Sequence, residues 1–314
     1  MSRGRGATLR PREPRPAAEG SGLQSLHARV PSKPDPPPGP PPRRSQRRIG
    51  PGALTEAPQS AAAPYLGELR VPNGKPPDLA RSDGRLVVAS YNVHRWSGIR
   101  GTRFAPERAG AVIQELDADV LALQEVLRPY DADDPLLEVA DLAGYHLAFV
   151  VTRRHRRGGE LGNAILSRWP LQGAHVIDLS YGRLEQRAAL AATFRTDEGP
   201  VTVASTHLAL VDATRKQQVR ALLGHPALAE GPAVLLGDMN AWRADPSARD
   251  LARVFSAHHN RAWPATYPSV APVLALDRAY VRGARLAHIR AHDSPNARRA
   301  SDHLPVVATL HLDA

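Results

Sequence analysis

Short apolar runs that end in polar residues recur along the chain from Leu86 onwards, and they predict buried β-strands. The clearest is the run at 233–236, which is too short for a helix and follows Gly231 and Pro232. Similar patterns predict strands over residues 86–94, 119–126, 145–151, 163–167, 174–179, 187–195, 201–208, 273–281, 285–291 and 306–312.

Helical periodicity falls between these runs. Residues 106–116 begin with a proline, which the first turn tolerates, and repeat apolar residues at three- and four-residue spacing. Residues 212–224 combine an acidic cap, an apolar stripe and a terminal glycine. Shorter helices are expected over 135–143 and 246–254. Because strands outnumber helices, the pattern predicts an α/β (α+β) sandwich with mixed sheets rather than an alternating parallel fold.

The first 84 residues differ in composition from the rest of the chain. They contain 17 of the 30 prolines and carry a net charge of +7, out of +10 for the whole chain. The stretch at 36–48, PPPGPPPRRSQRR, cannot form a helix or a core. We therefore expect residues 1–84 to be a disordered, basic, Pro/Arg-rich tail. Such a tail could dock electrostatically on nucleic acid or an anionic membrane, but a solvated linker is the plainer interpretation.

The composition also limits the chemistry. The chain has no cysteine, so any metal must be held by oxygen or imidazole ligands. No apolar run approaches the ~18 residues of a membrane-spanning helix, and the N-terminus lacks the apolar part of a secretory signal. We expect a monomeric cytoplasmic protein without a transmembrane segment, and peripheral membrane association stays open.

Polar residues lie where the predicted strands end. Asp238 and Asn240 follow the strand at 233–236 and, two residues apart, project from the same side of an extended chain. A carboxylate beside a carboxamide oxygen suits Mg²⁺ or the orientation of a phosphate. The alternative is an Asx-type turn, in which both side chains cap their own backbone. The other strand ends or turns with polar groups hold Asn92, Glu125, His207, Asp277, Asp302 and His303.

Eight short motifs follow one another along the chain: YNVH, LQEV, GNAILS, QRAAL, STHL, GDMN, LDRAYV and SDHLPV. In this order they resemble the motifs of the endonuclease/exonuclease/phosphatase superfamily, which includes DNase I, AP endonucleases, neutral sphingomyelinases and inositol-polyphosphate phosphatases. The resemblance covers residues 86–312 and implies a catalytic domain over 85–314. It also implies a DNase I-like four-layer sandwich, with two mixed, mainly antiparallel sheets packed face to face and helices outside.

The resemblance implies Mg²⁺-dependent hydrolysis of a phosphodiester or phosphomonoester by an activated water, with Mn²⁺ as a possible substitute. Glu125 would be the principal metal ligand, with Asn92 beside it, and Asp302 is a further candidate ligand. Asp238 and Asn240 would hold the attacking water and a phosphate oxygen.

The remaining implied roles concern proton transfer and phosphate binding. His303 would be the general base or electrostatic partner of the water, oriented by Asp277. His207 would contact the scissile phosphate or protonate the leaving oxygen. Arg187 would clamp the phosphate through two oxygens, and Asn163 would lie at the pocket floor or only form a turn.

The substrate stays open between classes. A nuclease-like phosphodiesterase comes first, since the RRHRR run at 153–157, Arg298, Arg299 and the tail could contact nucleic-acid phosphates. Against it, the region after the tail has a net charge of only +3. The first alternative is a phospholipid or sphingomyelin phosphodiesterase, although no single loop is rich in Trp, Phe or Leu. The second is a non-catalytic module that binds anionic ligands, although none of the expected Glu, Asp or His positions is missing.

Overall fold

The computed structural model describes residues 63–72, 84–156, 158–182, 184–243, 245–255 and 262–312, all within the compact unit Pro58–Ala314. The strands are β1 (Tyr65–Arg70), β2 (Arg85–Asn92), β3 (Val120–Arg128), β4 (His146–Arg154), β5 (Glu160–Ser167), β6 (Leu171–Asp178), β7 (Ala188–Thr196), β8 (Gly199–His207), β9 (Ala233–Asp238), β10 (Asp277–Arg282), β11 (Ala284–Ala291) and β12 (Val306–Leu312). The helices are η1 (His94–Trp96), α1 (Pro106–Leu116), α2 (Pro135–Ala143), α3 (Asp212–Leu223), η2 (Pro226–Leu228), α4 (Pro246–Val254) and α5 (Ala297–Ala300).

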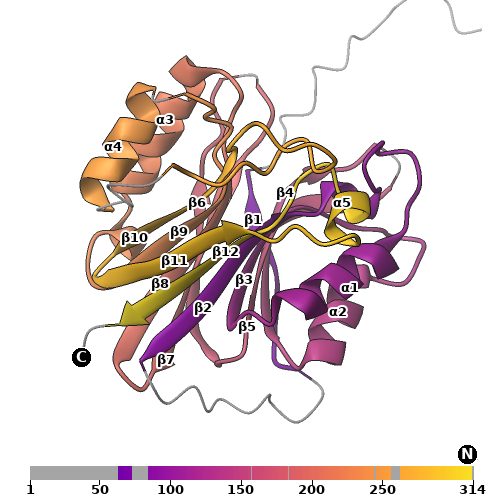
Figure 1. The fold of residues 1–314 in the computed structure, drawn as a ribbon, viewed down its shortest axis with the longest axis horizontal. Helices are drawn as coiled ribbons and strands as arrows, with labels where there is room; N and C mark the ends of the chain where they lie inside the picture. The colour runs from indigo at the N-terminus through magenta and orange to yellow at the C-terminus, as the bar shows by residue number, and fades with distance from the viewer. Residues whose placement is uncertain are drawn as a thin grey trace, which may run out of the picture. The chain divides into compact units, whose positions relative to one another are not determined.

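These elements form the expected four-layer sandwich (Figure 1). One sheet has seven strands in the order β1-β4-β5-β3-β2-β12-β11, and the other has five in the order β10-β9-β8-β7-β6. Helices α1, α2 and α5 cover the larger sheet, while α3 and α4 cover the smaller one. The predicted fold of two mixed, mainly antiparallel sheets with helices outside is confirmed, since among the described strands only β2–β3 and β8–β9 are parallel pairs.

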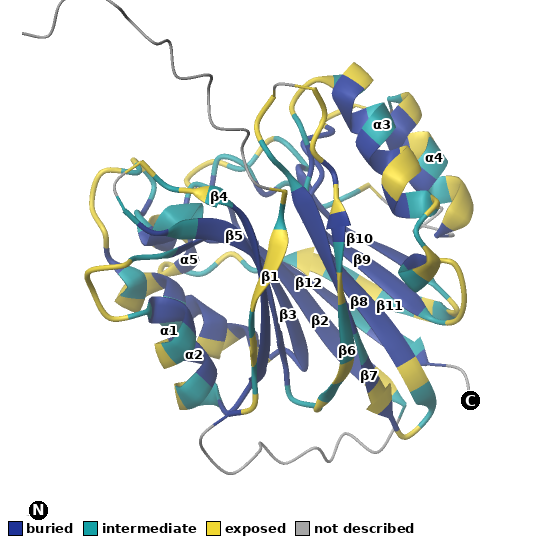
Figure 2. Ribbon diagram, turned by 180° about the vertical axis from the view of Figure 1, so that it is seen from behind, coloured by how far each residue is buried: buried dark blue, intermediate teal, exposed yellow. Residues whose placement is uncertain are grey.

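Three apolar interfaces hold the layers together. Along β2, alternate side chains serve different interfaces: Ala89 and Tyr91 pack toward the helices, whereas Leu86 and Val88 pack toward the other sheet. Both sheets are buried on both faces over most of their width, as the dark-blue strands of Figure 2 show. Full burial of one such aliphatic side chain stabilises a fold by roughly 1.5–3 kcal/mol. Because the three interfaces bury many of them, the strands are held firmly, and so are the side chains at their ends.

Local sequence signals fix where helices begin and end. In α2, the Asp134 carboxylate accepts a hydrogen bond from the backbone N–H of Leu136, Pro135 occupies the first turn, and Gly144 closes the helix in the left-handed conformation. In α4, Asp245 caps the N–H of Ala248 in the same way. These caps come directly after loops at the site end of the sheets, so they also fix the course of those loops.

One strand was not predicted, and several strand boundaries differ from the sequence prediction; for example, β5 begins at Glu160 rather than at 163, and β6 at Leu171 rather than at 174. Strand β1 lies inside the segment assigned to the disordered tail, and it forms the edge of the larger sheet against β4. The strand was missed because it is short, mostly exposed and contains Gly67, where an added Cβ would lie 2.6 Å from Val151 Cγ2. The rest of residues 1–84 lies outside the described residues, except 63–72 and Gly84. Strand β10 begins at Asp277 rather than at 273, because Leu274 forms an isolated bridge with Tyr267.

Helices long and apolar enough to cross a bilayer are absent from the part of the chain that the structure describes.

Candidate active site

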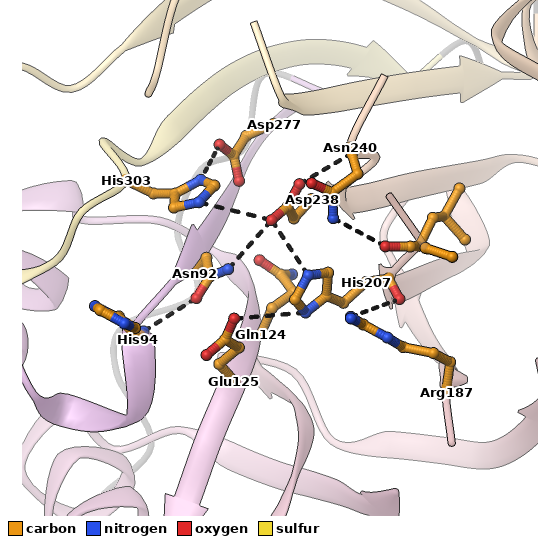
Figure 3. Close-up of polar contacts among 12 residues, drawn as sticks. Asn92, His94, Gln124, Glu125, Arg187, His207, Asp238, Asn240, Asp277 and His303 are labelled. Atoms are coloured by element: carbon orange, nitrogen blue, oxygen red, sulfur yellow. Dashed lines mark hydrogen bonds and ion pairs between the residues drawn. The ribbon is translucent and has the colours of Figure 1, made fainter. Parts of the chain in front are cut away.

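The polar strand ends predicted from the sequence meet at one end of the two sheets (Figure 3). Strand pairing brings them together, because His207 and Asp277 both lie opposite Asp238 in their pairings with β9. From the larger sheet, Asn92 is paired with Gln124, the residue before Glu125. The two sheets therefore place carboxylates, imidazoles and an amide within contact distance of one another.

Asp238 is the centre of this arrangement, and it is 2% exposed. Its Oδ2 atom accepts a hydrogen bond of 3.2 Å from Asn92 Nδ2 and lies 3.3 Å from His207 Nε2 and 3.7 Å from His303 Nε2. Its Oδ1 atom accepts the N–H of Asn240 at 3.0 Å. The Asx-type turn and the contacts with Asn92, His207 and His303 are therefore compatible, because each uses a different oxygen of the Asp238 carboxylate.

Asn240 contributes to this turn by its backbone conformation. Its φ of 49° lies in the left-handed region, so the chain is no longer extended after Asp238. The Asn240 side chain donates through Nδ2 to the Leu208 carbonyl at 2.9 Å, which leaves its Oδ1 as the atom for an external donor.

His303 is held by a carboxylate. Its Nδ1 lies 2.8 Å from Asp277 Oδ2, and Thr266 Oγ1 donates to the same oxygen at 2.6 Å. Burial alone would lower the pKa of His303, but Asp277 and Asp238 outweigh burial and raise it to about 10. Since Asp277 takes Nδ1, the Nε2 atom is the one that faces Asp238 and the site.

Burial acts differently on the two other titrating groups at the centre. It raises the pKa of Asp238 to about 6, against the opposing charge of His303 and with a further contribution from Asp277. Burial, together with the positive charges of Arg187 and His303, holds the pKa of His207 well below its usual value. The site therefore combines a neutral His207 with a carboxylate that titrates near neutral pH.

Glu125 reaches the site through a bulge in β3. The register against β5 shifts between Leu123 and Val126, and Glu125 has a φ of 51°. A non-glycine residue in this region is strained, and such strain is often found at functional positions. The Glu125 carboxylate lies 4.0 Å from His207 Nδ1 through Oε1 and 3.0 Å from Arg95 Nη1 through Oε2.

Asn92 and Asp302 are linked through His94. The Asn92 side-chain oxygen accepts the N–H of His94 at 3.0 Å, and His94 Nδ1 lies 3.3 Å from Asp302 Oδ1. Ser301 Oγ donates to the Asn92 carbonyl at 2.7 Å, which joins the SDH segment to the end of β2. Asp302 thus lies beside the Asn92 position, with His94 as its contact.

A cavity of about 80 Å³ adjoins the centre, and three of the four residues predicted to contact phosphate line it: Asn163, Arg187 and His207, but not Asn240. Asn163 lies inside β5 and donates to the Ala188 carbonyl at 2.9 Å, so the alternative that it only forms a turn is wrong. Arg187 donates to the His207 carbonyl at 3.3 Å and pairs with Glu185 at 2.5 Å. The lining of the cavity also includes Arg95, Glu125 and Arg153.

Two sets of side chains have the chemistry to hold a divalent cation. Asp238, Asp277 and His303 offer ligand atoms within 4.8 Å of one another. The hydrogen bond from His303 to Asp277 already occupies part of that space, so a cation there would have to displace a proton. Glu125, with Asn92 and Asp302 nearby, offers oxygen ligands alone, as Mg²⁺ prefers. Glu125 Oε2 is also buried, and its partner is the Arg95 guanidinium, a cation that a metal ion could replace, so this carboxylate fits a cation better.

Four supporting residues were missed by the sequence reasoning. Ser301 and Gln124 lie inside recognised motifs, and Gln124 is buried, where it donates to Ser205 Oγ from the other sheet at 3.2 Å. Thr266 and Arg95 lie outside the strands, so no alternation of apolar and polar residues marked them as part of the site. Only the fold brings Thr266 to Asp277 and Arg95 to Glu125.

The chain is similar in sequence and in fold to known proteins. The model of the "Endonuclease/Exonuclease/phosphatase family" matches residues 89–303. The Escherichia coli K12 protein YbhP is 29% identical over 248 residues, which is 72% of this chain and 96% of YbhP.

Two solved structures share the fold. An endonuclease/exonuclease/phosphatase from Beutenbergia cavernae has a TM-score of 0.57 at 25% identity and covers 73% of this chain and 72% of its own. A mannosyl-6-phosphatase from Bacteroides thetaiotaomicron has a TM-score of 0.58 at 18% identity and covers 72% and 99%. The site and these similarities lead to one conclusion: the chain belongs to the endonuclease/exonuclease/phosphatase family.

Proposed function

We propose that the protein is a divalent-metal-dependent phosphodiesterase, which uses Mg²⁺ in the first place and accepts Mn²⁺. The family supports a phosphoester hydrolase in general. The more specific proposal of a metal-dependent phosphodiesterase is supported by the contact of Asp238 with both His207 and His303, beside Glu125. A site of this composition combines a proton acceptor, phosphate-binding groups and oxygen ligands for a cation.

Asp238 is the proposed general base. Asn92 Nδ2 and the N–H of Asn240 each donate to one of its oxygens, which fixes the carboxylate plane. A pKa near 6 lets it accept a proton from water at neutral pH. The water oxygen then attacks phosphorus while the bond to the leaving oxygen breaks on the opposite side.

His303 has an electrostatic role in this proposal rather than that of the general base. Asp277 and Asp238 favour its charged form, and Nε2 is the atom that faces the site. An imidazolium at this position stabilises negative charge as it develops on the phosphate. Asp277, supported by Thr266, keeps the ring in this orientation.

Neutral His207 and Arg187 are the proposed phosphate contacts. His207 can donate one hydrogen bond from its ring, and its low pKa disfavours the alternative in which it protonates the leaving oxygen. Arg187 and Asn163 line the adjacent cavity, where a non-bridging phosphate oxygen would meet them.

The cation would be held by Glu125, with Asn92 and Asp302 as the other candidate ligands. When bound, it would draw electron density from the phosphate and so reduce the cost of charge on the leaving oxygen.

A diester is favoured over a monoester because space lies on both sides of Arg95. On one side is the cavity of Arg187, and on the other is a larger cavity of about 440 Å³. Phe104, Leu127 and Arg156 are among the residues that line the larger cavity. A phosphate substituted on two sides would use both spaces, whereas a monoester would use one.

The proposal is tested with bis(p-nitrophenyl) phosphate in Mg²⁺, Mn²⁺ and EDTA, followed by plasmid DNA, RNA and phospholipids. We expect turnover that requires the metal and falls at least ~100-fold in His303→Gln. His311→Gln is the matched control, because His311 lies in β12 at the opposite end of the sheet. Binding of DNA or vesicles without turnover of any diester would instead favour the non-catalytic module.

A further inference from the structure

Exposed apolar side chains concentrate at the end of the molecule that carries the site. Among the residues that the structure describes, fifteen large apolar side chains are highly exposed, and nine of them lie in loops at this end. The other six lie on α2, on α4, or on β1 and the residue just after it. The nine are Phe104, Tyr130, Tyr181, Leu184, Leu210, Val211, Trp242, Val270 and Val273.

Seven of these residues lie in loops that adjoin the strand ends of the five-stranded sheet, on the side of the site. Val270 and Val273 precede β10, Trp242 follows β9, Leu210 and Val211 follow β8, and Tyr181 and Leu184 join β6 to β7. Since these strands are neighbours in the sheet, their loops follow one another at this end, and we call the seven residues the apolar edge. Exposed segments at this end appear in yellow in Figure 2.

Charge is unevenly distributed along the apolar edge: Arg243 is exposed beside Trp242, and Glu185 and Arg187 follow Leu184, whereas the two other loops carry no charge. Residues 208–211 and 262–276 contain no Lys, Arg, Asp or Glu. Among its exposed side chains, Val273 is 74% exposed and Leu210 and Val211 are each 62% exposed. Nucleic acid would require a larger number of cations along this border, because phosphate neutralisation dominates its binding. Exposed apolar side chains gathered beside a polar site instead mark an interaction surface.

Cationic side chains lie on the other side of the site. Arg100 and Arg103 are exposed in the loop after η1, and Arg156 is exposed between β4 and β5. Phe104 and Tyr130 are exposed among them. Aromatic and aliphatic side chains next to arginines are the pattern that binds the boundary between acyl chains and anionic headgroups.

We propose that this end of the molecule docks on an anionic phospholipid bilayer, and that the phosphodiester hydrolysed at the site belongs to a lipid headgroup. The apolar edge would enter the headgroup boundary, while Arg100, Arg103 and Arg156 would contact anionic headgroups. The second part rests on the proposed phosphodiesterase activity, and the docking itself does not.

The test uses the full chain and vesicles of phosphatidylcholine with or without phosphatidylglycerol, in a sedimentation assay. The edge variant is Leu210→Ser, Val211→Ser and Val273→Ser together. The control is Leu142→Ser with Val254→Ser, whose side chains are exposed on α2 and α4. Residues 1–62 are present in every protein, so a difference between variants reports on the edge.

We expect the wild type and the control to bind the anionic vesicles, and the edge variant to bind at least ~10-fold more weakly, since three apolar contacts are lost. Hydrolysis of vesicle phosphatidylglycerol should fall equally, while turnover of soluble bis(p-nitrophenyl) phosphate should not change. Equal binding by the edge variant, or no binding by the wild type, would overturn the docking.

Three other outcomes separate the remaining explanations. If the wild type is a dimer and the edge variant a monomer by light scattering, the edge is a contact between copies and the proposal is wrong. If the edge variant loses turnover of plasmid DNA rather than lipid, the occupant is nucleic acid and the proposal is also wrong. Edge-dependent vesicle binding without turnover of any diester would support docking and refute the phosphodiesterase.

Discussion

The Nδ1 atom of His303 lies 2.8 Å from the carboxylate of Asp277, across 26 residues of sequence. Asp277 begins β10 in the five-stranded sheet, whereas His303 precedes β12 in the seven-stranded sheet. The contact therefore joins the two sheets at the site, and it orients the ring nitrogen that faces Asp238. Its strength should be measurable both in stability and in turnover.

The pH dependence of stability follows from this pair. The pKa of His303 in the fold is about 10, above the value near 6.5 for an unfolded histidine. Because the folded value is raised, the stabilisation is complete below about pH 6.5 and is lost as the pH rises through about 10. In EDTA, we expect Asp277→Asn to unfold more easily than the wild type at pH 7, by on the order of 2 kcal/mol. Urea unfolding should show this gap closing by pH 10 to 11, and a gap independent of pH would contradict the ion pair.

Thr266 should act through Asp277 rather than on the substrate. Its hydroxyl donates to Asp277 Oδ2 at 2.6 Å, and Thr266 is fully buried. We expect Thr266→Val, which keeps the shape, to lower kcat roughly 10-fold with little change in KM. Thr266→Ser keeps the hydroxyl and should restore most of kcat. Equal losses in both variants would indicate a packing role for the methyl group instead.

Arg95 should compete with the cation for Glu125. Its guanidinium lies 3.0 Å from Glu125 Oε2. Removal of this charge in Arg95→Met should lower the Mg²⁺ concentration for half-maximal activity about 2–5-fold, as expected for a partly exposed ion pair. Arg103→Met, in the loop that follows η1, is the control. A higher Mg²⁺ requirement in Arg95→Met would mean that Arg95 helps to hold the bound state.

Much of the site could be predicted because apolar strands mark their own ends. The polar residues at those ends, such as His207 and Asp238, could be identified from the sequence before any pairing of strands was known. Glu125 was also identified, although it lies in a bulge inside β3 rather than at the strand end. The contacts that support these residues could not be predicted in this way. Thr266 lies in an irregular loop, and its link to Asp277 depends on how that loop folds back.

The apolar edge shows a second limit of sequence reasoning. No loop contributes more than two of its exposed side chains, so no single segment is unusually apolar. Only the strand order places Leu210, Trp242 and Val273 on one border. Strand β1 was missed for a related reason, because an edge strand with few buried residues lacks the apolar run of a central strand.

The most direct test of the account is the Mg²⁺-dependent hydrolysis of bis(p-nitrophenyl) phosphate by Glu125→Gln. This change keeps the size of the side chain but removes the charge that a cation needs. Glu138→Gln is the control, because Glu138 is exposed on α2. We predict that Glu125→Gln loses about 100-fold or more of the metal-dependent rate and that Glu138→Gln loses none. Full Mg²⁺-dependent turnover in Glu125→Gln would contradict the assignment of this site as the catalytic centre.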